Sequence, residues 1–169
     1  METWEKIARQ YHSALEMLES AIRTCPKAIW LDSSGDSPNR YWHIAYHALF
    51  YTHFYLAPSD ADFVPWPLHR EGYNYLGEAP RQPGHRFKAD QPYDPPELLD
   101  YALFCHSEVN RQMPSIDFEA PSGFYWLQFS KFELQLYNLR HLAHHTGQLA
   151  DRLRAQANLG VGWVRCRNR

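Results

Sequence analysis

Hydrophobic residues recur at helical spacing over the first part of this 169-residue chain. Between residues 2 and 24 they alternate in steps of four and three, which places them on one side of an α-helix. The stripe consists of Trp4, Ala8, Tyr11, Leu15, Leu18 and Ile22. Because Pro26 cannot continue a helix, the pattern predicts a first helix over about residues 2–24 with one buried face.

A second helical pattern follows a turn predicted at residues 33–36. Ser37 is expected as the N-cap and Pro38 at the first helical position, and Pro58 limits the helix to about residue 57. One face of this helix carries Ile44, His47, Ala48, Tyr51 and Tyr55. A histidine is therefore predicted on the buried side, near the middle of the second helix.

The C-terminal half predicts two more helices, each with a capping box at its start. Asp94 and Glu97 precede the third helix, and Ser130 and Glu133 precede a fourth that reaches about residue 157. The buried stripe of the third helix consists of Leu98, Ala102, Cys105, Val109 and Met113. Both segments therefore carry a start signal and an apolar face.

Residues 58–93 form a long connection between the second and third helices. Its six prolines exclude another long helix, and its aromatic residues are too frequent for a disordered linker. We expect an ordered flap packed on the helices and long enough for a crossover. Four helices with almost no strand signal predict an all-α four-helix bundle with one long crossover connection, folded as a single domain over residues 1–169.

Composition narrows the class of protein. A net charge of −2 gives no reason to expect nucleic acid or an anionic membrane as a partner. Three widely spaced cysteines without a CxxC pair are typical of a reducing cytoplasm. The chain has no run of about 18 apolar residues and is charged from Glu2 onward, so neither a membrane helix nor a signal peptide is predicted. We expect a soluble, cytoplasmic protein.

The chain contains ten histidines, and two of them are four residues apart in the fourth helix. His141 and His145 are separated by about 40° around the helix axis and one turn along it. Burying two imidazoles together costs roughly a few kcal/mol of free energy unless their nitrogens have binding partners, and one cation can be the partner of both rings. His47 lies at a matching depth on the second helix. These three histidines are the predicted metal ligands.

Other histidines compete for these roles. His144 is three residues after His141 and can pair with it instead, although the spacing of four converges better. His43 is four residues before His47, but the adjacent Trp42 suggests a packing role. His53 points about 120° away from His47 and is not expected as a ligand. The remaining histidines, on the helices and in the flap, are weaker candidates for metal ligands. They are His12, His106, His69 and His85.

Three neutral imidazoles leave a coordination position open for water or substrate. Zinc and nickel suit such ligands and iron is possible, so the residues alone do not choose among these metals. Gly147, in the middle of a helix, predicts close helix packing or room for a ligand beside the metal. Gln148 is placed to bond an imidazole or a substrate.

Residues 141–148, His-Leu-Ala-His-His-Thr-Gly-Gln, together with Trp42 and His47, resemble the DinB-like (YfiT-like) metalloenzyme superfamily. The resemblance implies a four-helix bundle with one crossover and a divalent metal held by His47, His141 and His145. It also implies a homodimer, the state in which members of the family are frequently found. Thr146 stands where the family commonly has arginine. Some members transfer low-molecular-weight thiols or isomerise maleylpyruvate with a thiol cofactor.

Two function classes follow. The first is a metal-dependent enzyme that acts on an unknown small molecule, either a hydrolase or a thiol S-transferase that uses a low-molecular-weight thiol. The second is a non-catalytic metal-binding or stress-associated protein whose metal stabilises the bundle. If the histidines only pack together, no ion is bound, and His141→Ala leaves the metal content unchanged.

Overall fold

The computed structural model describes residues 1–32, 39–79 and 84–166, and all its regular elements are helical. The predicted all-α class is confirmed. The described residues contain no strand, only an isolated antiparallel bridge between Pro121 and Ser130. In chain order the elements are α1 (Thr3–Thr24), α2 (Lys27–Leu31), α3 (Tyr41–Phe54), α4 (Pro95–Gln112), the 3-10 helix η1 (Met113–Ser115) and α5 (Lys131–Ala157).

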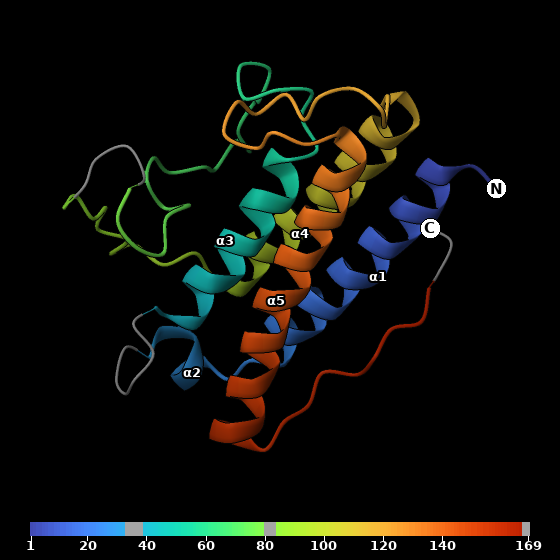
Figure 1. Ribbon diagram of the computed structural model, residues 1–169. Helices are drawn as coiled ribbons and strands as arrows, with labels where there is room; N and C mark the ends of the chain where they lie inside the picture. The colour runs from blue at the N-terminus through green and yellow to red at the C-terminus, as the bar shows by residue number, and fades with distance from the viewer. Residues whose placement is uncertain (33–38, 80–83, 167–169) are drawn as a thin grey trace.

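The four long helices lie alongside one another (Figure 1). Helix α3 packs against α4 and α5, and α1 packs against the same two helices from the other side. Helices α3 and α4 run in the same direction, so the connection between them returns along the length of α3 (Figure 1). The C-terminal segment turns back beside α1, where Ser13 Oγ donates to the carbonyl oxygen of Arg165.

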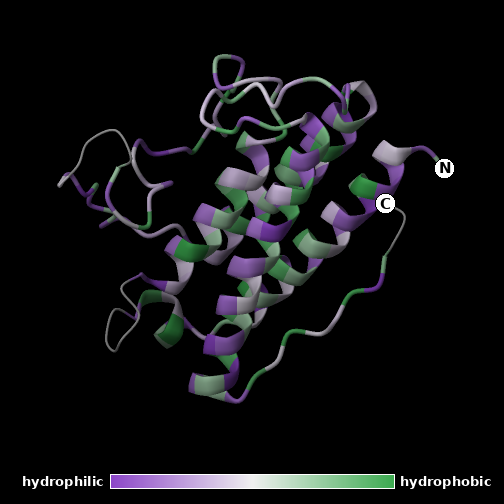
Figure 2. Cartoon of the chain, viewed as in Figure 1, coloured by the Kyte–Doolittle hydropathy of each residue, from purple (hydrophilic) through white to green (hydrophobic). Residues whose placement is uncertain are grey.

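The predicted stripes of α1 and α4 form the core. All six predicted positions of α1 are buried except Trp4, which is half-buried, and all five of the predicted third helix are buried. Hydrophilic and hydrophobic residues alternate along each long helix (Figure 2). The capping box of α4 is present, because Asp94 accepts from the backbone of Glu97 and the Glu97 carboxylate accepts from the backbone of Asp94.

The start predicted for the second helix is wrong. Helix α3 begins at Tyr41, after Arg40 in extended conformation, and ends at Phe54 rather than near residue 57. Arg152 of α5 donates to the carbonyl oxygen of Asn39, which holds the chain extended just before the helix. Ser37, Pro38 and the predicted turn at 33–36 lie outside the described residues.

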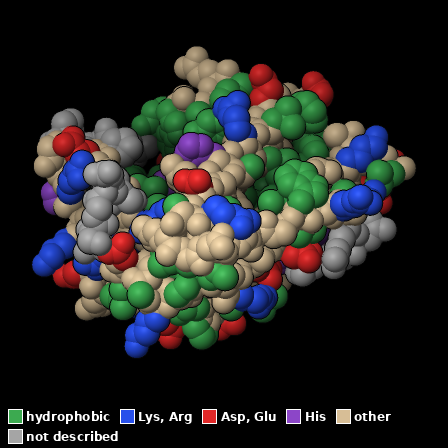
Figure 3. Space-filling view, turned by 90° about the horizontal axis from the view of Figure 1, so that it is seen from below, with side chains coloured by type: hydrophobic (Ala, Val, Ile, Leu, Met, Phe, Trp, Pro, Cys, Tyr) green, Lys and Arg blue, Asp and Glu red, His purple; other side chains and the backbone are tan. Residues whose placement is uncertain are grey.

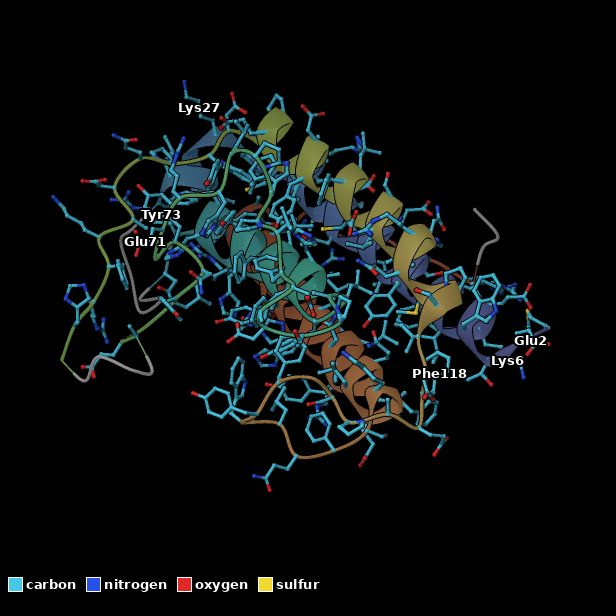
Figure 4. The ribbon with its side chains drawn as sticks, turned by 90° about the horizontal axis from the view of Figure 1, so that it is seen from above. Glu2, Lys6, Lys27, Glu71, Tyr73 and Phe118 are labelled. Atoms are coloured by element: carbon cyan, nitrogen blue, oxygen red, sulfur yellow. The ribbon has the colours of Figure 1, made fainter. Side chains whose placement is uncertain are left out.

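Helix α3 is the central element and is covered on almost every side. Of its 14 residues, all are buried except His47 and Tyr51, which are half-buried. The described part of the 58–93 connection packs on its outer face, where the rings of Tyr46 and Tyr93 stack at 4.7 Å. Figure 4 shows Tyr73, which contacts Trp42, where the connection approaches this helix. The described residues of the connection therefore pack on α3.

Helix α5 begins where the sequence predicts. Ser130 accepts from the backbone N–H of Glu133, and the Glu133 carboxylate accepts from the backbone N–H of Ser130. The helix runs for 27 residues to Ala157, and its C-cap Asn158 has a left-handed φ of 53°. The described helices include none long and apolar enough to cross a membrane. Acidic and basic side chains are interspersed on the face seen in Figure 3.

Replacing the N-cap Ser130 with alanine is expected to lower the free energy of unfolding by about 1 kcal/mol, because one N–H at the start of α5 loses its acceptor. The melting temperature of a chain of this size should then fall by about 2–4 °C. Ser107→Ala is the matched control, since this exposed hydroxyl bonds only within its own helix. Equal shifts in both variants, measured by calorimetry, would contradict the capping role.

Candidate metal centre

Three histidines from two helices meet on the outer side of the α3–α5 contact. The Nε2 atom of His141 lies 3.0 Å from that of His47 and 3.1 Å from that of His145. Among the described residues this is the group whose ligand atoms, all within 4.8 Å of one another, could hold a metal ion. His145 is buried, and His47 and His141 are half-buried. The structure thus brings together the three histidines that the sequence singles out.

In two of these rings the other nitrogen, Nδ1, is hydrogen-bonded to the protein. His47 Nδ1 donates to the backbone carbonyl oxygen of Asn74 at 2.6 Å, and His145 Nδ1 donates to Gln148 Oε1 at 2.7 Å. Because an oxygen acceptor requires the proton on Nδ1, the Nε2 atoms of both rings carry bare lone pairs. Such outer hydrogen bonds are what orient metal-bound imidazoles in proteins.

The bare nitrogens need a positive partner. His141 can carry one proton on Nε2 at most, and that proton serves one neighbour at a time. Burial, followed by the repulsion of the neighbouring histidines, lowers the pKa of His47 to about 2 and that of His141 to about 4. Burial also lowers the pKa of His145, against the bond to Gln148. Near neutral pH the rings are therefore uncharged and their lone pairs converge.

The donor set fits a divalent cation. Nitrogen ligands at about 2.0–2.1 Å from a tetrahedral ion lie a little over 3 Å apart, close to the separations of 3.0 and 3.1 Å that His141 Nε2 makes with its two neighbours. His141 Nδ1 is buried without a hydrogen-bond partner among the described residues, so the protein does not fix the tautomer of this ring. One ion would satisfy all three Nε2 atoms at once, which no arrangement of protons achieves.

Tyr51 and Asn74 form the outer wall of the centre. The ring centroid of Tyr51 lies 4.8 Å from that of His47 and 5.3 Å from that of His141, and the Asn74 amide donates to the Tyr51 hydroxyl at 3.4 Å. Burial raises the pKa of Tyr51 to about 12. The sequence pattern places Tyr51, one turn from His47, on the correct face, but nothing in the sequence marks it as part of the site. Asn74 contributes a backbone carbonyl, which leaves no residue signature.

The competing histidines on the same helices lie elsewhere. His144 is exposed and does not join the group, although its ring neighbours that of His145. His43 stacks on Trp42 and bonds the carbonyl oxygen of Tyr73 at 2.7 Å, which is the packing role expected for it. His53 is buried, and its Nδ1 lies 3.2 Å from the Tyr101 hydroxyl.

His12 and His106 form a separate buried pair between α1 and α4. Their Nδ1 atoms are 2.7 Å apart, and His106 Nε2 bonds Glu19 at 2.8 Å. His12 Nε2 bonds Asn110 at 2.9 Å, so all four ring nitrogens have partners. This pair is a hydrogen-bonded chain with the Glu19 carboxylate at one end, and it holds no converging set of three donors.

The expected close contact at Gly147 is absent. A Cβ built at this position meets no heavy atom of the described residues within 4 Å, and the residue is exposed. Close helix packing therefore does not explain the glycine. Gln148, by contrast, makes the bond to an imidazole that was predicted for it.

Comparison with protein-family models, with curated proteins and with solved structures found no match. The centre is therefore interpreted from its own geometry.

Gln148→Ala is expected to weaken metal binding by about 10- to 100-fold, because His145 loses the acceptor that keeps its proton on Nδ1. Competition with a chromogenic chelator measures the change. Gln156→Ala, at an exposed position of the same helix, is the matched control. An unchanged affinity in the Gln148 variant would mean that this bond does not orient the ring.

Proposed function

We propose that this protein binds one divalent metal ion through His47, His141 and His145. The observation that carries the proposal is the convergence of three Nε2 atoms, two of which are held unprotonated by bonds on the opposite edge of the ring. Zinc or nickel is the proposed metal, with iron as the next choice, since all three accept imidazole ligands.

We further propose that the centre is catalytic. His47 and His141 are half-buried rather than sealed, and the described residues add neither a carboxylate nor a thiolate to the group. Three protein ligands with a free position are typical of catalytic rather than structural sites. A bound divalent ion supplies a Lewis acid that polarises a substrate or lowers the pKa of a bound water or thiol toward neutrality.

The proposed reaction is the transfer of a low-molecular-weight thiol to an electrophile. The three cysteines of the chain are not part of the centre. Cys105 is buried against the carbonyl oxygen of Leu49, Cys25 bonds the carbonyl oxygen of Pro26, and Cys166 accepts from the side-chain amide of Gln10 in α1. The thiol therefore comes from a second molecule. Its sulfur forms the new bond to carbon, the leaving group takes the electron pair of the broken bond, and the thiol proton passes to solvent.

The resemblance of residues 141–148 to the DinB-like superfamily supports this proposal. With it come the proposals of a four-helix bundle with one crossover, of a homodimer, and of a cytoplasmic location. The parallel course of α3 and α4 is in keeping with such a topology (Figure 1).

Elemental analysis of protein purified without an affinity tag tests the metal, with about one equivalent per chain expected. Loss of a chlorodinitrobenzene electrophile is then followed with several thiols, before and after chelation. Thiol-dependent turnover that chelation abolishes and added metal restores is expected. A metal-loaded protein that shows no turnover, but loses much of its thermal stability on chelation, would instead have a stabilising metal.

A further inference from the structure

Tyr51 shares the accessible part of α3 with the metal ligand His47. These two residues, one helical turn apart, are half-buried, and the other residues of the helix are buried. Across the contact with α5, the ring of the half-buried His141 lies 5.3 Å from that of Tyr51. A molecule that enters the centre along α3 therefore meets the Tyr51 side chain.

A single residue of the connection holds both His47 and the Tyr51 hydroxyl. The backbone carbonyl oxygen of Asn74 accepts from His47 Nδ1 at 2.6 Å, and the side-chain amide of Asn74 donates to the Tyr51 hydroxyl at 3.4 Å. Asn74 is itself buried. The hydroxyl thus has a defined position relative to one of the metal ligands.

The proton of this hydroxyl is available to a ligand. A phenol hydroxyl keeps its proton at neutral pH and can donate one hydrogen bond while it accepts others. The Tyr51 oxygen accepts from Asn74, and within residues 1–32, 39–79 and 84–166 no acceptor takes its proton. Contacts of the ring with those of His47 and His141 limit its movement. Tyr51 is therefore a hydrogen-bond donor held beside the centre.

Space for a ligand lies next to this donor. Tyr51 and Asn74 line a cavity of about 710 Å³ between α3, the connection and the turn at residues 125–126. Small-molecule sites commonly have volumes of about 300–1,000 Å³. A molecule of ordinary metabolite size can therefore lie in the cavity while one of its atoms reaches the centre.

We propose that the Tyr51 hydroxyl binds the substrate of the centre by donating a hydrogen bond to the atom that fills the open position of the metal ion. This inference rests on the proposed function, since it requires a bound ion. An atom that keeps a lone pair after coordination, such as a thiolate sulfur or an anionic nitrogen, accepts this bond. A neutral imidazole nitrogen does not, because its single lone pair is used for the metal. The hydroxyl therefore selects the first kind of ligand, and its own proton is not transferred.

Tyr51→Phe tests the donor, because it removes the hydroxyl and leaves the ring beside His47 and His141. Cobalt(II) is loaded into the full chain, since its visible absorption reports on the ligands around it, and azide and imidazole are the probes. The affinity for azide should fall by about 10- to 100-fold, as for loss of a hydrogen bond to a charged group. The affinities for imidazole and for cobalt should stay close to the wild-type values.

Tyr137→Phe is the matched control. It removes a hydroxyl from α5, one turn before His141, at a ring that contacts Tyr55 and Phe129. Both probes should bind this variant as they bind the wild type.

The outcomes separate this inference from the proposed function. Equal affinity of cobalt-loaded wild-type and Tyr51→Phe protein for azide overturns the role of the hydroxyl, and is the result expected if its proton is committed to Asn74. An equal loss for azide and imidazole also overturns it, because the substitution has then disturbed the centre itself. A wild-type protein that takes up no divalent ion overturns the proposed function and this inference together. Binding of metal and azide without turnover of any thiol overturns the proposed reaction alone and leaves the role of Tyr51 standing.

Discussion

His141→Ala should abolish stoichiometric metal binding. Loss of an outer hydrogen bond to a metal ligand costs about 10- to 100-fold in affinity, and loss of the ligand itself must cost more, so the dissociation constant should rise by well over 100-fold. His141 is the ring whose Nε2 lies next to both other donors, and without it His47 and His145 form a two-ligand set. Elemental analysis and chelator competition measure the effect.

His144→Ala is the control for this substitution. It removes an exposed imidazole from the same helix, three residues away, that neighbours the ring of His145 but supplies no ligand atom to the group of three. Its metal content and affinity should match those of the wild type. If the two variants retain metal equally, while circular dichroism shows that both are folded, then the ion is not held at this centre.

The local elements of the fold could be predicted because their signals are local. The capping boxes at Asp94 and Ser130 need only two residues three positions apart, and both form as expected. The stripes of α1 and α4 follow from spacing alone. Helix α2 was missed because five residues are too short to show a period. The start of α3 was misplaced because Arg152, far along the chain, bonds the carbonyl oxygen of Asn39.

The candidate site also has a part that local sequence predicts and a part that depends on how the chain folds. The pairing of His141 with His145 is a helical spacing, and the match of His47 in depth follows from helix lengths and directions. Asn74 could not be found, because it acts through a backbone oxygen supplied by the connection. The aromatic residues of the connection predicted an ordered flap, but the cavity that they enclose depends on how the flap folds back on α3.

Metal-free protein should lose most of its stability between pH 6.5 and pH 4. Burial lowers the pKa of His47 to about 2 and those of His53 and His141 to about 4, while each unfolded histidine titrates near 6.5. Over this range the unfolded chain binds more protons than the folded one, so the free energy of unfolding falls as the pH falls. Each such histidine lowers the free energy of unfolding by about 1.4 kcal/mol for every pH unit between its unfolded and its folded pKa. At pH 5 three of them cost about 6 kcal/mol, similar to the whole stability of many domains.

His53→Phe isolates one of these contributions at a residue outside the metal centre. The side chain lies among the rings of Phe63, Tyr101 and Phe104, so a phenyl ring suits its surroundings. With chelator present throughout, urea unfolding at pH 7 and pH 5 should show a loss about 2 kcal/mol smaller in this variant than in the wild type. The difference between the two pH values is compared, because it cancels the pH-independent cost of losing the bond to Tyr101. Ser107→Ala, which removes no titratable group, should leave the loss unchanged. An identical loss in His53→Phe and wild-type protein would mean that folded His53 takes up its proton without penalty, and that the acid sensitivity arises at other groups.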